Sequence, residues 1–195
     1  MVKKLLSAMM ILSLVGLFTT TLNAADVPTK KKKLTPQGLY LTAKEAHDMV
    51  KADPAKILFI DVRTPEELYL VGYTAMIDKN IPIAYVDYTK IKEKKGKAKF
   101  ASHVNKKFKD QVEAALKAKG LTKEDKIIFM CRSGSRSTHS AKVMDKAGYK
   151  NVYTVVDAFE GDKDKTTRKR TVNGWKNDGL PWGYKFHKEK FILER

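Results

Sequence analysis

The stretch IIFMCRSGSRSTHSAKVM, Ile127 to Met144, holds the only cysteine of the chain, Cys131. The apolar residues before the cysteine run without alternation, which predicts a strand buried on both faces. A helical pattern follows from Ser137 to Ala147, and Gly148 ends it. Strand, loop and helix in this order are typical of an α/β fold, in which ligands bind at the carboxyl ends of the strands. We therefore expect Cys131 at the ligand-binding edge of a sheet.

The alternation of strands and helices continues on both sides of this stretch. Lys56 to Val62 (KILFIDV) is an apolar run of strand length, and capping boxes predict helices before it, at Thr42 with Glu45, and after it, at Thr64 with Glu67. These spacings predict an α/β fold with a mostly parallel central sheet and helices on both faces. The other elements expected are strands within Ala75–Ile83 and Asn151–Val156, and a helix from Val104 to Gly120.

Three charged segments lie outside these elements. Residues 25–38 combine Pro, Gly and four consecutive lysines, and we expect them to form a flexible basic lead-in. Residues 88–100 are too charged and irregular for a core and are expected to form a surface insertion, and residues 161–171 are expected to form a solvated loop.

The first 24 residues resemble an export signal. Lys3 and Lys4 precede the apolar run Leu5–Phe18, and Ala24 or Ala25 is a small residue suited to cleavage. The apolar run is too short to span a bilayer core of about 30 Å, so we expect cleavage, no membrane span afterwards, and a periplasmic protein. The expected division is a signal peptide at 1–24, the lead-in at 25–38, one domain at 39–182 and a C-terminal tail at 183–195.

The chain is strongly basic. Cleavage after Ala24 would remove two lysines and no acid, and would reduce the formal net charge from +17 to +15. The lysines are spread over many segments without interleaved aromatic residues, which favours a solvated basic surface over a nucleic-acid site. The basic surface would also suit an acidic protein partner, and the sequence leaves this alternative open.

The loop after Cys131 has the composition of an anion site. Gly134 allows a positive φ angle, so the loop can turn its backbone N–H groups inward near the start of the following helix. Arg132 and Arg136 add two permanent positive charges, and this environment favours a thiolate. A lone cysteine cannot form an internal disulfide, and in an oxidising compartment a free thiol is a liability unless it is buried or used. An isolated cysteine is otherwise more often buried and inert.

Several motifs resemble the rhodanese domain family, over roughly residues 39–182. They are the six-residue loop CRSGSR (Cys131–Arg136), FIDVR (Phe59–Arg63) leading into PEEL, the pair Gly72-Tyr73, the strand entry Asn80-Ile81-Pro82, and GW…GLP at Gly174, Trp175 and Gly179–Pro181. This sequence departs from the family in having Tyr73 where histidine is usual, a longer segment between Gly72 and Pro82, and an extended tract from Gly161 to Gly174. The position of Tyr73 is expected to be structural, and the extended tract is a candidate lid or docking surface.

The resemblance implies a rhodanese-like fold and sulfur transfer. Cys131 would take a sulfane sulfur from thiosulfate or polysulfide as a persulfide and pass it to cyanide or another thiol. Asp61 and Arg63 would brace the site, and no cofactor or metal is implied. The loop residues that would bind the donor are Arg132, Ser133, Gly134, Ser135 and Arg136.

Three other functions are weighed against sulfur transfer. A cysteine-dependent phosphatase needs five residues between its cysteine and arginine, whereas four separate Cys131 from Arg136. A metal site is disfavoured, because the histidines are scattered at His47, His103, His139 and His187. A non-catalytic persulfide carrier or protein-docking module is the strongest alternative.

Overall fold

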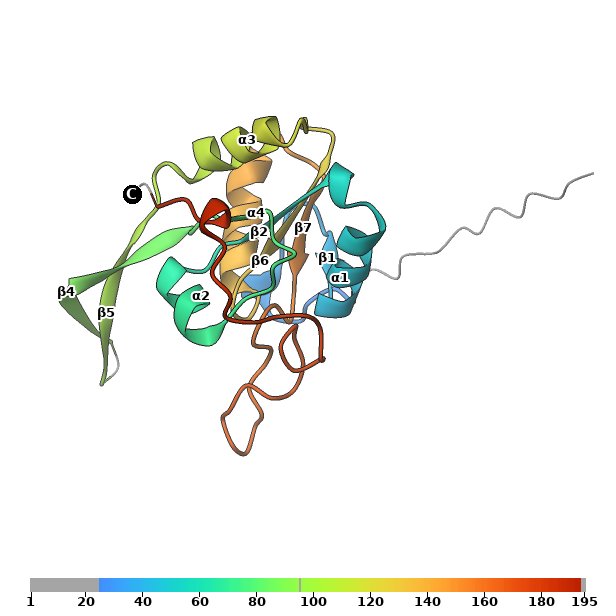
Figure 1. Ribbon diagram of the computed structural model, residues 1–195. Coiled ribbons are helices and arrows are strands. Elements are labelled where there is room, and N and C mark those ends of the chain that lie inside the picture. Colours follow the sequence, from blue (N-terminus) through green and yellow to red (C-terminus); the bar gives the residue numbers. More distant parts are fainter. Residues whose placement is uncertain (1–24, 95, 194–195) are drawn as a thin grey trace, which may run out of the picture.

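The computed structural model describes residues 25–94 and 96–193 (Figure 1). The export signal predicted at residues 1–24 lies outside the described residues. Within the described ranges, no helix is both long and apolar enough to cross a membrane.

The centre of the molecule is a sheet of five parallel strands, in the order β1-β7-β6-β2-β3. Strand β2 pairs with β6 along its whole length, so the two strands that lead to the DVR motif and to Cys131 lie side by side. The strands are β1 (Tyr40–Leu41), β2 (Ile57–Asp61), β3 (Lys79–Asn80), β6 (Lys126–Met130) and β7 (Val152–Val155).

In the described part of the chain, four α-helices connect the strands. The connections through α1 and α2 move across the sheet in one direction, and those through α3 and α4 move back in the other. Right-handed crossovers therefore place the two pairs of helices on opposite faces of the sheet (Figure 1). The predicted fold class is confirmed. The helices are α1 (Ala43–Ala52), α2 (Pro65–Val71), α3 (Phe108–Ala118) and α4 (Ser135–Lys146), with short 3-10 turns η1 (Lys31–Lys33), η2 (Pro54–Lys56) and η3 (Lys188–Lys190).

Both predicted capping boxes are present. The amide of Glu45 donates to Thr42 Oγ1 over 3.2 Å, and the Glu45 carboxylate accepts from the Thr42 amide over 2.7 Å. The Thr64 and Glu67 pair does the same at the start of α2, with distances of 3.4 and 3.1 Å. Each box satisfies backbone groups that a helix start leaves unpaired.

The segment from residue 84 to residue 104 differs from the prediction. The charged stretch expected to be irregular belongs to an antiparallel hairpin of β4 (Ala84–Lys94) and β5 (Lys97–Val104), which projects from the domain (Figure 1). Val104 pairs with Ala84 in this hairpin, so α3 starts at Phe108 and not at Val104 as predicted. The side chain of Asn105 donates to Pro82 O over 2.8 Å and holds the chain between the hairpin and the helix.

The strand expected within residues 75–83 is reduced to Lys79–Asn80. The preceding residues form a turn in which the Ile77 amide donates to Thr74 O. Only Lys79 and Asn80 pair with β2, and Ile81 and Ile83 continue beyond the strand as buried residues.

The core is built on the two central strands. Every residue of β2 is buried, as are all of β6 except Lys126, in agreement with the unalternated apolar runs. The buried ring of Trp175, from the GW motif, packs on Phe59 with 5.6 Å between centroids, and its Nε1 donates to Pro181 O of the GLP motif. Both C-terminal motifs therefore have a packing role.

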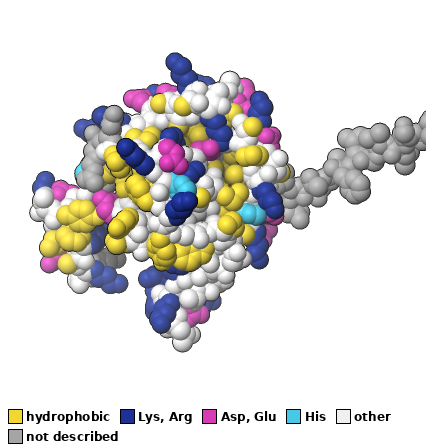
Figure 2. All heavy atoms as spheres, in the orientation of Figure 1, with side chains coloured by type: hydrophobic (Ala, Val, Ile, Leu, Met, Phe, Trp, Pro, Cys, Tyr) yellow, Lys and Arg dark blue, Asp and Glu magenta, His cyan; other side chains and the backbone are white. Residues whose placement is uncertain are grey.

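The two ends of the described chain lie on the domain. In the segment expected to be a flexible lead-in, the Ala25 amide donates to Tyr40 O and Lys33 is buried. In the expected tail, Gly183 exchanges backbone hydrogen bonds with Tyr73, and Phe191 bridges to Asn80 at the edge of the sheet. On the face drawn in Figure 2, Lys and Arg side chains are spread among acidic and apolar ones.

Candidate functional site

Cys131 directly follows β6, at the carboxyl edge of the sheet, as the sequence predicts. Its sulfur accepts a hydrogen bond from the Gly134 amide over 3.1 Å and lies 3.6 Å from Ser137 Oγ. The residue exposes only 1% of its surface. The thiol therefore faces the start of α4, where backbone N–H groups and the helix dipole favour negative charge.

Gly134 is required by the shape of the loop. Its φ angle is +92°, and a Cβ atom placed on it would lie 2.5 Å from Val156 O and 3.1 Å from Lys33 Cε. The side chains of Ser137 and Thr138 each donate to Gly134 O over 2.9 Å. The loop is thus fixed in a conformation that a residue with a side chain would strain.

The segment after β7 holds the first two residues of the loop. The Phe159 amide donates to Cys131 O, and the Glu160 amide donates to Arg132 O, each over 3.0 Å. These backbone bonds join the main chain of Cys131 and Arg132 to the segment after β7.

Arg136 forms an ion pair with Glu67 of α2. Its two terminal nitrogens donate to the two carboxylate oxygens over 2.5 and 2.6 Å. Burial raises the pKa of Glu67, but the hydrogen bonds and charge of Arg136 outweigh it, so the pKa lies below its ordinary value. Burial lowers the pKa of Arg136, but Glu67 and then the charge of Cys131 outweigh it and raise the pKa. Arg136 is therefore coupled to both the carboxylate and the thiol.

The five loop residues expected to bind the donor differ in their exposure to solvent. Arg132 is exposed, Ser133 and Ser135 are half-buried, and Gly134 is buried. Arg136 is half-buried and paired with Glu67, so much of its charge is already neutralised within the protein. Among the residues of this loop, all of which the structure describes, Arg132 is the exposed arginine, and donor binding by the loop stays a prediction.

Asp61 and Arg63 form a fully buried ion pair beside the loop. Arg63 Nη2 donates to Asp61 over 2.7 Å and to Gly72 O over 3.1 Å, and the guanidinium lies 4.1 Å from the centre of the Phe159 ring. Asp61 pairs with Met130, the residue before the cysteine. This arrangement fits the bracing role expected of the DVR motif.

Most of the domain matches the model of a known protein family. Residues 42–165 match the model described as "Rhodanese-like domain". The chain belongs to the rhodanese-like domain family. The matched range begins after Lys33 and ends before Trp175, so both residues of this rhodanese-like protein lie outside the family match.

The chain is also similar to other proteins over much of its length. An uncharacterized protein of Rickettsia conorii is 33% identical over 141 residues, which cover 72% of this chain and 93% of that protein. An uncharacterized protein of Rickettsia prowazekii is 35% identical over 127 residues, covering 64% of this chain and 81% of the relative. The crystal structure of Rv0390 from M. tuberculosis is similar with a TM-score of 0.54 and 26% identity, and the match covers 75% of this chain and 97% of that chain.

Tyr73 stands where the rhodanese motif usually has histidine. Its ring is buried, its hydroxyl donates to Lys185 O over 2.8 Å, and it accepts from the His187 amide over 3.0 Å. Tyr73 thus fastens the C-terminal segment to the domain, in agreement with the structural role predicted for this position.

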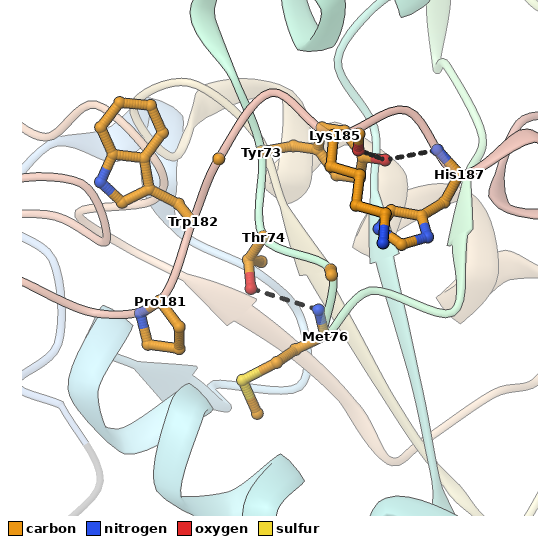
Figure 3. Close-up of a pocket in the computed structure, with 9 residues that line it drawn as sticks. Tyr73, Thr74, Met76, Pro181, Trp182, Lys185 and His187 are labelled. Atoms are coloured by element: carbon orange, nitrogen blue, oxygen red, sulfur yellow. Dashed lines mark hydrogen bonds between the residues drawn. The ribbon is translucent and has the colours of Figure 1, made fainter.

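A cavity of about 420 Å³ lies beside Tyr73, between the chain that leads to β3 and the chain after Pro181 (Figure 3). Met76 and Trp182 supply much of its apolar lining, and Lys185 and His187 lie at one side. Cys131 is not among the lining residues, so the cavity belongs to the C-terminal segment of this rhodanese-like domain and not to the cysteine loop.

Sequence reasoning missed three residues around the loop. Glu67 was assigned only to a capping box, although its carboxylate also binds Arg136. Phe159 and Lys33 come from segments far from the loop in sequence, and no local pattern distinguishes them. Lys33 belongs to a run of four lysines, and such a run predicts side chains that are exposed to solvent.

Proposed function

We propose that this rhodanese-like protein is a sulfurtransferase that carries sulfane sulfur on Cys131 in the periplasm. The observation that supports it most is the position of the Cys131 sulfur, which accepts from the Gly134 amide over 3.1 Å at the start of α4. A backbone donor at this position stabilises negative charge on sulfur without moving during the reaction.

In the first step, the Cys131 thiolate attacks the outer sulfur of thiosulfate or of a polysulfide. A new sulfur–sulfur bond forms at Cys131 as the old one breaks, and with thiosulfate the electron pair of the broken bond leaves on sulfite. The enzyme then carries a persulfide anion. Gly134 N–H stabilises this anion, and exposed Arg132 attracts the charged donor.

In the second step, cyanide or an acceptor thiolate attacks the outer sulfur of the persulfide. With cyanide the product is thiocyanate, the bond between the two sulfurs breaks, and its electron pair returns to Cys131 as thiolate. Charge balances in both steps without a proton or a cofactor. One cysteine is sufficient for this two-step cycle, which agrees with the single cysteine of the chain.

Thiocyanate formation from thiosulfate and cyanide tests the proposal. The wild-type protein should form thiocyanate, and Cys131→Ser should not, while both should fold alike. The same preparations should release no phosphate from a phosphate monoester, which separates sulfur transfer from the phosphatase alternative. Absence of turnover with a folded wild-type protein, with both thiosulfate and polysulfide, would refute the proposal.

A second candidate function is protein docking by a non-catalytic rhodanese-like module. The low exposure of Cys131, at 1%, favours it, because a nucleophile must be reached. Alkylation by iodoacetamide discriminates the two: an enzyme should react at Cys131 in the native state faster than a free thiol at neutral pH, whereas a docking module should react only after unfolding.

The periplasmic location rests on the expected export signal. It is tested by determining the first residue of the protein recovered from the producing cell. Recovery in the periplasmic fraction with Ala25 as the first residue would support the proposal, and a cytosolic protein that retains residues 1–24 would contradict it.

A further inference from the structure

One lysine of the basic lead-in lies behind the cysteine loop. Lys33 exposes 7% of its surface, whereas its neighbours Lys31 and Lys32 are exposed. Its ammonium group donates to Val156 O over 2.5 Å. Burying an ammonium group is costly unless it is paired, and this hydrogen bond supplies one partner.

The contacts of Lys33 lead to Gly134, which binds the sulfur of Cys131. Its side-chain carbons Cδ and Cε lie 3.3 and 3.1 Å from the position of a Cβ on Gly134, and Val156 O lies 2.5 Å from the same point. The Lys33 side chain and the carbonyl that it binds therefore both lie against Gly134. The amide of Gly134 is the backbone group that donates to the cysteine sulfur.

Opposing charges surround this lysine. Burial lowers the pKa of Lys33, and the carboxylate of Asp162, 3.6 Å away, partly offsets the effect. Lys30 also donates to Asp162, over 3.3 Å. The other charged groups that face the loop or Lys33 are Asp157, Arg132, Arg136, Glu67 and the Asp61–Arg63 pair.

We propose that Lys33 is a positioning residue of the sulfur-transfer site. Its side chain supports Gly134, and its positive charge behind the loop favours the anionic forms of Cys131, both thiolate and persulfide. The inference rests on the proposed function, since it assigns Lys33 to that site. It also makes the segment before residue 39 part of the functional unit, although the family match begins at residue 42.

The test is the rate of Cys131 alkylation by iodoacetamide as a function of pH. Lys33→Met keeps much of the apolar side chain and removes the charge, and Lys32→Met removes the same charge from an exposed neighbour. As a general scale, a unit charge about 10 Å from a titrating group, at an effective dielectric constant of about 20, shifts its titration by roughly one pH unit. Lys33→Met should raise the midpoint by up to about this amount. Lys32→Met and Lys33→Arg should both leave the midpoint near that of the wild type, because Lys33 is unchanged in the first and the charge is kept in the second.

Asp162→Asn gives a second test of opposite sign. Removing the counter-charge of Lys33 should lower the midpoint, whereas a merely structural disturbance of the loop would move both variants in the same direction. The inference is overturned if Lys33→Met matches Lys32→Met, or if Lys33→Met and Asp162→Asn shift the midpoint in the same direction. If Lys33→Met does not fold, Lys33→Arg and Asp162→Asn still decide.

These measurements do not require sulfur transfer. A wild-type protein that forms no thiocyanate but shows the two opposite shifts would refute the proposed function, and would leave in place only the electrostatic effect of Lys33 on the Cys131 thiolate. If Lys33→Met and Lys32→Met form thiocyanate equally and have equal midpoints, the role of Lys33 is refuted and the proposed function stands.

Discussion

Replacing Glu67 by Gln should reduce stability far more than the same change at Glu45. Both residues complete a capping box, and glutamine can serve in either box. Only Glu67 also holds Arg136, and Glu45 forms no ion pair with a described residue. The matched pair of variants therefore isolates the contact between α2 and the cysteine loop.

The magnitude follows from the geometry of the Arg136 pair. Two hydrogen bonds of 2.5 and 2.6 Å join side chains that are 31% and 24% exposed. A buried hydrogen bond to a charged group contributes about 1.5–3 kcal/mol, and partial exposure reduces this value. We expect Glu67→Gln to lower the free energy of unfolding by about 2 kcal/mol and Glu45→Gln by less than about 0.5 kcal/mol.

Urea denaturation at several pH values measures both effects. The pKa of Glu67 is lowered in the folded state, so its contribution is present above the ordinary value of 4.5 and is lost as the pH falls through the folded pKa. The difference between wild type and Glu67→Gln should therefore shrink on acidification. Equal losses in the two variants, or a difference that does not change below pH 4.5, would refute the reasoning.

Three further changes should show how the site is built. Gly134→Ala should lower the free energy of unfolding, measured in urea, by about 2–4 kcal/mol. Gly120 also has a positive φ angle, +72°, but has open space around it, so Gly120→Ala should lower the same free energy by about 1 kcal/mol. Equal losses would show that the contacts at Gly134 do not matter. Asp61→Asn leaves buried Arg63 without its counter-charge and should lower the unfolding free energy by about 3 kcal/mol, with a loss below 1 kcal/mol contradicting this. Burial raises the pKa of Asp157 to about 6, so the folded state loses stability as the pH rises from about 4 to about 6. Asp157→Asn should therefore gain about 2–3 kcal/mol relative to wild type between pH 4 and pH 7, and no gain would show that the pKa is not raised.

The fold and the cysteine position could be predicted because their signals are local. The unalternated apolar runs, the capping boxes and the CRSGSR loop each lie within a few consecutive residues. The β4–β5 hairpin was missed because its strands are largely exposed and rich in lysine, so they lack the apolar alternation of a half-buried strand. Its pairing instead includes cross-strand contacts such as that of Tyr88 with Phe100, whose rings lie 5.2 Å apart.

The surroundings of the cysteine could not be predicted because they depend on tertiary contacts. Glu67 satisfies a local capping rule, and that rule explains the residue without reference to Arg136, which is 69 positions away. Lys33 is one of four consecutive lysines, and only the packing against Gly134 distinguishes it from the others. Local patterns therefore predicted where Cys131 lies, but not which charged residues surround it.

Intact-mass spectrometry after incubation with thiosulfate tests the central claim most directly. The account predicts a gain of one sulfur atom on wild-type protein, none on Cys131→Ser, and loss of the added sulfur when cyanide is supplied. A folded wild-type protein that gains no mass from thiosulfate or polysulfide, or that gains it equally without Cys131, would contradict the account.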